Sequence, residues 1–164
     1  MKQFAFIPLL FILLLVGCAV SDEELKTTTT ENVQQGFKAE PQKPNEDGGP
    51  FSYFLPEGFE IKKTKNSNIL LEEDGQRFIL FSNENEENNS QVSYQTLASQ
   101  YKNPVIQETI EDKNRFGYVF VNEIEKNTYE VTIGIGGTKM TTETKSQNVA
   151  ESAKMMMTIV SSVQ

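Results

Sequence analysis

The sequence predicts an α+β domain in residues 51–164, built on an antiparallel sheet of about six to seven strands flanked by helices. Short apolar runs separated by turn signals predict the strands, and two stretches with apolar residues every three or four positions predict the helices. Residues 78–81 and 118–121 are apolar on both faces of a strand, which requires cover on both sides of the sheet. These observations favour an α/β/α layering.

The first half of the domain is predicted to be a three-stranded meander followed by a short helix. Strands are expected at residues 60–65, 69–73 and 76–82. Asp74-Gly75 joins the last two, and this pair is favoured in hairpins because both positions tolerate positive φ. Beyond a polar loop, residues 94–101 have helical spacing.

The second half is predicted to be another antiparallel meander that ends in a helix. Strands are expected at residues 105–111, 116–124, 128–136 and 140–144. The closing helix, expected at 147–162, places its apolar residues on one face. They are Val149, Ala153, Met156, Val160 and Val163.

The first 17 residues have the organisation of an export signal. Lys2 precedes an uninterrupted apolar run at residues 4–16, and small residues follow. A helix of that length rises about 20 Å, whereas a membrane span needs about 30 Å. We therefore expect residues 1–17 to be a signal peptide that is removed.

The end of this run, Leu15-Val16-Gly17-Cys18, resembles the lipobox of bacterial lipoproteins. The resemblance implies that the Cys18 thiol is alkylated with a diacylglyceryl group carrying palmitate-type chains, after which the signal is cut before Cys18. Two or more acyl chains anchor a protein stably. The expected location is the extracytoplasmic face of the cell membrane.

Residues 18–50 are predicted to be the lipidated Cys followed by a disordered linker. The segment contains one aromatic residue, Phe37, beside a run of four Thr and several Pro and Gly. So little apolar surface does not offset the entropy of ordering the chain. A coil of this length would span about 30 Å.

Composition excludes several classes of function. A net charge of −8 argues against a nucleic-acid partner. The chain has no His, and its single Cys is Cys18, so zinc, haem and Ser-His-Asp or Cys-His sites lack an essential member. We expect no cofactor and no enzymatic activity, although a glycosidase-type carboxylate pair stays open. Its candidates are Glu72, Glu73, Glu123, Glu125 and Glu130.

The polar loop 83–89 is the one weak candidate for a metal site. Glu84, Glu86 and Glu87 offer oxygen ligands for calcium, but the loop lacks the spacing and central Gly of an EF-hand. A solvated connector is the favoured interpretation. A cluster of lysines at 62, 63 and 65 is expected to protect a sheet edge.

The order of elements resembles the PsbP-like superfamily of small α/β/α domains. The motifs that carry the resemblance are Phe54-Leu55-Pro56-Glu57-Gly58-Phe59 and Ile159-Val160-Ser161-Ser162-Val163. The resemblance implies an accessory module that binds an envelope protein at the membrane. The alternative is a lipoprotein that binds a ligand or cation in a pocket of its single small core.

Overall fold

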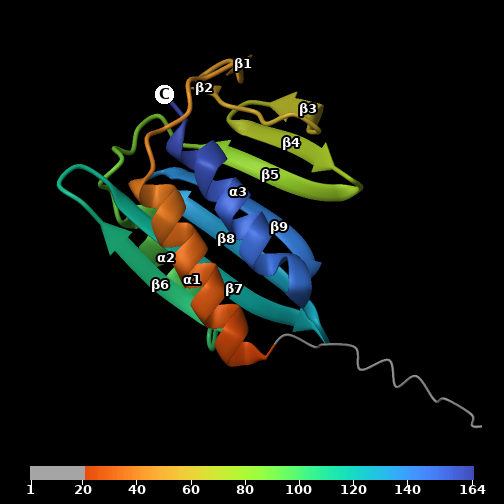
Figure 1. The fold of residues 1–164 in the computed structure, drawn as a ribbon. Helices are drawn as coiled ribbons and strands as arrows, with labels where there is room; N and C mark the ends of the chain where they lie inside the picture. The colour runs from red at the N-terminus through yellow and green to blue at the C-terminus, as the bar shows by residue number, and fades with distance from the viewer. Residues whose placement is uncertain (1–20) are drawn as a thin grey trace, which may run out of the picture.

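The computed structural model describes residues 21–164. The predicted signal peptide and lipobox, including Cys18, lie outside the described residues. Seven antiparallel strands form one sheet with helices on both of its faces, so the predicted α+β fold is confirmed (Figure 1). The helices are α1 (Asp22–Lys38), α2 (Val92–Gln100) and α3 (Val149–Ser161), the last preceded by a 3-10 turn, η1 (Ser146–Asn148).

Two antiparallel meanders meet in the middle of this sheet. Its strands are β3 (Glu60–Lys65), β4 (Asn68–Glu73), β5 (Gln76–Ser82), β6 (Ile106–Glu111), β7 (Phe116–Glu125), β8 (Thr128–Ile135) and β9 (Thr138–Lys145). They are arranged in the order β3-β4-β5-β9-β8-β7-β6. β9 joins the halves because it pairs with both β5 and β8. The seven predicted strands agree with these bounds to within two residues.

The turns follow the sequence signals. Asp74 and Gly75 have φ of 48° and 78° in the β4–β5 hairpin, as expected for an Asp-Gly turn. At the edge of the sheet, β3 contains a bulge after Ile61, and all of its residues are exposed. Its lysines therefore lie on an edge strand, which confirms the sequence interpretation.

The main core lies between one sheet face and helices α1 and α3, which run side by side across it (Figure 1). α3 packs on β8 and β9, while α1 lies over β6 and β7. On the same face of the sheet as α1 and α3, strands β4 and β5 are covered by the segment that contains Phe51, Tyr53 and Leu55. Part of that segment forms a small two-stranded sheet of β1 (Glu46–Asp47) and β2 (Ser52–Tyr53).

Helix α1 lies in the segment that was predicted to be a disordered linker. The prediction of a disordered linker over 18–50 was wrong for its described part, because residues 22–38 form a helix and residues 46–53 form a hairpin. The helix buries the residues Leu25, Thr29, Val33 and Phe37, which are spaced by four. Its first turn is capped by Ser21, whose Oγ accepts a hydrogen bond from the Glu24 backbone nitrogen at 3.2 Å.

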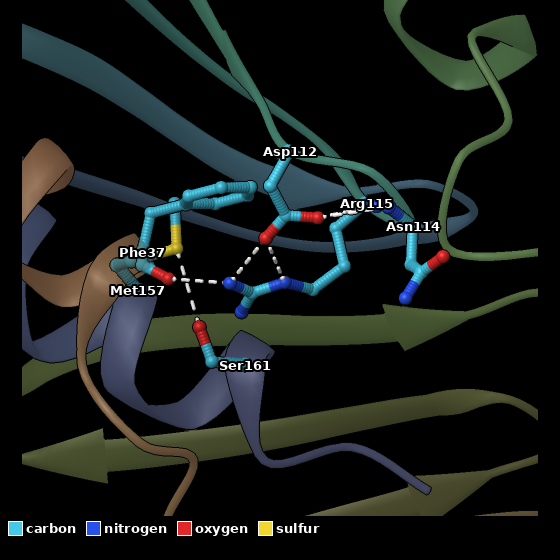
Figure 2. A network of polar contacts seen from close by, with 6 residues as sticks. All are labelled: Phe37, Asp112, Asn114, Arg115, Met157 and Ser161. Atoms are coloured by element: carbon cyan, nitrogen blue, oxygen red, sulfur yellow. Dashed lines mark hydrogen bonds and ion pairs between the residues drawn. The ribbon is translucent and has the colours of Figure 1, made fainter.

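Two of the contacts that hold α1 involve α3 and Arg115, which follows β6. Gly36 lets α1 approach α3 so closely that a Cβ there would lie 2.9 Å from Met157 Cγ. At the end of α1, Arg115 donates to the Phe37 carbonyl oxygen at 2.9 Å and stacks on the Phe37 ring (Figure 2). Asp112 holds that guanidinium at 2.6 Å. The α+β domain therefore begins with α1 and not at residue 51.

Helix α2 lies on the opposite face of the sheet. It packs on β7 through a second cluster that contains Leu97, Phe116, Tyr118 and Phe120. Residues 118–121 of β7 are thus covered on both sides, as predicted. Residues 78–81 of β5 are not: Phe78 and Leu80 are buried, but Ile79 on the other side is 50% exposed. The nine residues of α2 cover only one half of this face.

Candidate functional site

The predicted site at Asn83–Asn89 is a fixed connector at one end of the sheet. The Asn83 backbone nitrogen donates to the Gly137 carbonyl oxygen at 3.2 Å, and Phe116 donates to that of Asn88 at 2.8 Å. Gly136 has a φ of 55°, and a Cβ there would lie 2.3 Å from the Glu87 carbonyl oxygen. The glycine is therefore required both for its own conformation and for the close packing of the loop.

The three glutamates of this loop have different roles. Glu86 accepts hydrogen bonds from Asn83 Nδ2 at 2.8 Å and Ser90 Oγ at 2.9 Å, so its carboxylate holds the loop against the start of α2. Glu84 and Glu87 are exposed. Across residues 21–164, no group of three or more His, Cys, Asp or Glu side chains is placed to hold a metal ion. The structure therefore gives the calcium interpretation of the loop no support.

The carboxylates named as a possible catalytic pair take part in local interactions. Lys62 lies 3.2 Å from Glu72, and its hydrogen bond lowers the pKa of that carboxyl. Glu130 accepts a hydrogen bond from Tyr101, while Glu123 accepts one from the Asn127 backbone nitrogen at 3.1 Å. Burial raises the pKa of Glu73, with repulsion from Asp74 and Glu151 adding to the effect. Glu125 is exposed at the end of β7.

The feature that sequence reasoning missed is the uncovered half of the sheet face that carries α2. We call it the open face and define it by the outward residues of β4, β5 and β9. These are Asn68, Leu70 and Glu72 on β4, Arg77, Ile79 and Phe81 on β5, and Lys139, Thr141 and Glu143 on β9. A hollow of about 660 Å³ extends along it from Leu70 to Glu130, and a second of about 410 Å³ adjoins it at Ile79 and Thr141.

Strand register explains which side chains share this face. Residues directly opposite in an antiparallel pair point to the same side. One row across the sheet therefore contains Lys63, Leu70, Ile79, Thr141 and Thr132. The next contains Lys65, Asn68, Phe81, Lys139 and Gly134. The two rows thus combine apolar side chains and lysines with small residues.

The charges on the open face and on β3 beside it are separated. The two rows above carry Lys63, Lys65 and Lys139 and no acidic residue. Among the described residues these three lysines form no ion pair, although Lys139 lies 5.6 Å from the centre of the Phe81 ring. The row beyond them is acidic: Glu72 is ion-paired to Arg77 at 3.5 Å, and Glu143 and Glu130 lie opposite each other along the larger hollow.

The covered and open halves meet at Tyr101, which follows the last residue of α2. Its hydroxyl donates to Glu130 on β8, and burial together with this partner raises the pKa of Tyr101 to about 12. Beside it, the hydroxyls of Thr132 and Thr141 lie 3.0 Å apart. A polar seam therefore separates the aromatic cluster under α2 from the open face.

Comparison of the chain with models of protein families and with curated proteins finds no match to either. Between residues 21 and 164, no helix is both long and apolar enough to cross a membrane. Any functional assignment therefore depends on the residues themselves.

Proposed function

We propose that this chain is a lipid-anchored extracytoplasmic lipoprotein whose domain is a non-catalytic interaction or accessory module at the cell envelope. The observation that carries the proposal is the open face, where Ile79 is half exposed in the middle of a sheet. Contiguous apolar surface rimmed by polar groups is typical of an interaction site. The hollows along it are open grooves, which suit a macromolecular partner.

Helix α1 shortens the distance that would separate a lipid anchor at Cys18 from the domain. Cys18 precedes the helix cap Ser21 by three residues, and a chain of that length spans at most about 10 Å. The domain would therefore stay close to the membrane and would not move on a 30 Å linker. The 17 residues of α1 extend about 25 Å, so the loop Asn83–Asn89 at the other end would face away from the lipid.

The architecture also supports a proposed relationship to the PsbP-like superfamily. A meander, a helix, a second meander and a closing helix follow one another in the order that this resemblance implies. The Phe54–Phe59 motif lies between β2 and β3, and Leu55 within it is buried in the main core. The shared role of accessory modules at membranes agrees with the proposed function.

Substitution of Cys18 tests the anchor. We expect Cys18→Ala to abolish incorporation of labelled palmitate and to leave the signal peptide uncut, while Ser21→Ala, a nearby control outside the lipobox, is processed normally. Mass spectrometry of the mature N-terminus and fractionation of membranes provide the measurements. A wild-type protein that is released without detergent, or whose N-terminus differs from Cys18, would disprove the anchor.

A further inference from the structure

We propose that the open face is a docking site for an acidic amphipathic helix of an envelope protein. This inference rests on the proposed function, because it names the partner of that interaction module. It depends on three features of the open face, which are its width, its residues and its position relative to α1.

The width of the open face matches one helix. It comprises β4, β5 and β9, and neighbouring strands lie about 4.8 Å apart, so it is about 10 to 14 Å wide. A helix with its side chains is about 10 to 12 Å across. On the other face of the sheet, α1 and α3 lie next to one another (Figure 1). A helix beside α2 would complete the same arrangement on this face.

The residues of the open face indicate the chemistry of that helix. Leu70, Ile79 and Phe81 offer an apolar strip, which an apolar helix stripe would bury. Lys63, Lys65 and Lys139 accompany the strip without an acidic residue in their rows. In a chain with a net charge of −8, this concentration of positive charge is local. Carboxylates beside the apolar stripe of the partner would meet it.

The position of the open face argues against two other occupants. A lipid-anchored Cys18 would be connected to the start of α1, which lies on the opposite side of the sheet. The residues between Cys18 and α1 span only about 10 Å, so the open face would not reach the lipid surface. A second copy of this chain would have to bring its sheet past α2, which stands on the same face. The identity of a crosslinked species distinguishes both occupants from a partner helix.

The test is site-specific photo-crosslinking of the full-length chain in its own cells. A benzoyl-phenylalanine is placed at Thr141 in the open face, at Glu84 in the exposed loop, or at Lys154 on the outer side of α3. We expect a discrete adduct from position 141 that exceeds those from 84 and 154. Peptide sequencing should find the link in a segment with acidic residues beside apolar ones at helical spacing.

Charge reversal provides the matched measurement. Lys63, Lys65 and Lys139 are changed together to Glu, and in the control Lys102, Lys113 and Lys154, all exposed elsewhere, are changed to Glu. Both variants alter the net charge by −6. We expect the first to reduce the adduct from position 141 at least about tenfold and the control to leave it unchanged. Equal thermal melting of both variants shows that each is folded.

The outcomes separate this inference from the proposed function. A link from position 141 to lipid, to this same chain, or to a segment without acidic amphipathic character overturns the docking proposal, as does a yield that charge reversal leaves intact. A protein adduct from 84 or 154 in the absence of one from 141 keeps the interaction module but moves its site. No protein adduct from any of the three positions overturns both proposals.

Discussion

Strands β5 and β7 carry similar runs of apolar residues, but they differ in what covers them. β7 lies between α1 on one side and α2 on the other, and residues 118–121 are at most 1% exposed. β5 has cover on one side only, where Phe78 and Leu80 are buried. A strand that is apolar on both faces therefore indicates that both faces must be covered by other residues. Where no helix of the chain covers one face, that face is available to a partner.

Introducing a charge at the α1 interface should give the largest effect, because α1 covers one side of β7 with fully buried side chains. Val33→Asp would bury an unpaired carboxylate, and we expect it to reduce the free energy of unfolding by more than about 4 kcal/mol. The adjacent Gln34→Asp, on the exposed side of the same helix, should change it by less than about 0.5 kcal/mol. Denaturant titration of both variants makes the comparison. Equal effects would mean that α1 is not packed on the domain.

Two phenylalanines test the comparison of strands directly. Phe120 on β7 is buried under α2, whereas Phe81 on β5 is partly exposed on the open face. We expect Phe120→Ala to reduce the free energy of unfolding by about 3 to 5 kcal/mol and Phe81→Ala by about 1 kcal/mol or less. Urea unfolding of the isolated chain measures both values. A loss at Phe81 as large as that at Phe120 would show that the open face is covered by this chain itself.

Arg115 should give a smaller effect, confined to the end of α1. Arg115→Ala removes its hydrogen bond to the Phe37 carbonyl oxygen and its stacking on the ring, so we expect a loss of about 1 to 2 kcal/mol. Amide exchange should accelerate at the C-terminal turn of α1 and stay unchanged in β5. Arg77→Ala, the control at the open face, lacks that effect because Arg77 is mostly exposed. Faster exchange throughout the sheet in Arg115→Ala would contradict this local role.

The smallest effect is expected at the seam between the two halves, as a dependence on pH. The folded pKa of Tyr101 is about 12, above its ordinary value of 10, so the unfolded chain loses this proton first. Its contribution to stability is therefore complete below pH 10 and is lost as pH rises through 12. Tyr101→Phe should flatten part of the decline in unfolding free energy between pH 10 and 12. Identical slopes in both proteins would disprove this role.

The sequence predicted the sheet well because alternation and turn chemistry are local signals. Asp74-Gly75 specified a hairpin, and the helical spacing in α3 specified its buried face, although α1 also buries Met157. The linker prediction failed because one of the four evenly spaced buried positions of α1 is a threonine and not an apolar residue. Thr29 occupies the position between Leu25 and Val33 and is buried like them. The capping pair Ser21 and Glu24 was the signal that could have revealed this helix.

The open face could not be predicted from the same local signals. The apolar pattern of β5 indicates that both sides avoid water, but it does not say how many helices reach each side. That number depends on α2, which is nine residues long and packs on β7. The lysines at 63, 65 and 139 belong to two different strands, and register alone brings them to one surface.

The docking of α1 also determines how the molecule would respond to mechanical force. A pull at residue 21 enters through α1, which within residues 21–164 has no backbone hydrogen bonds to the sheet. Packing against α3, β6 and β7 holds it, together with side-chain contacts of Lys26, Asn32 and Phe37. Such a load shears side chains along the helix axis, whereas separating β8 from β9 would require breaking a hydrogen-bonded ladder. The helix would therefore detach first and leave the sheet intact, lengthening the connection to the point of pulling.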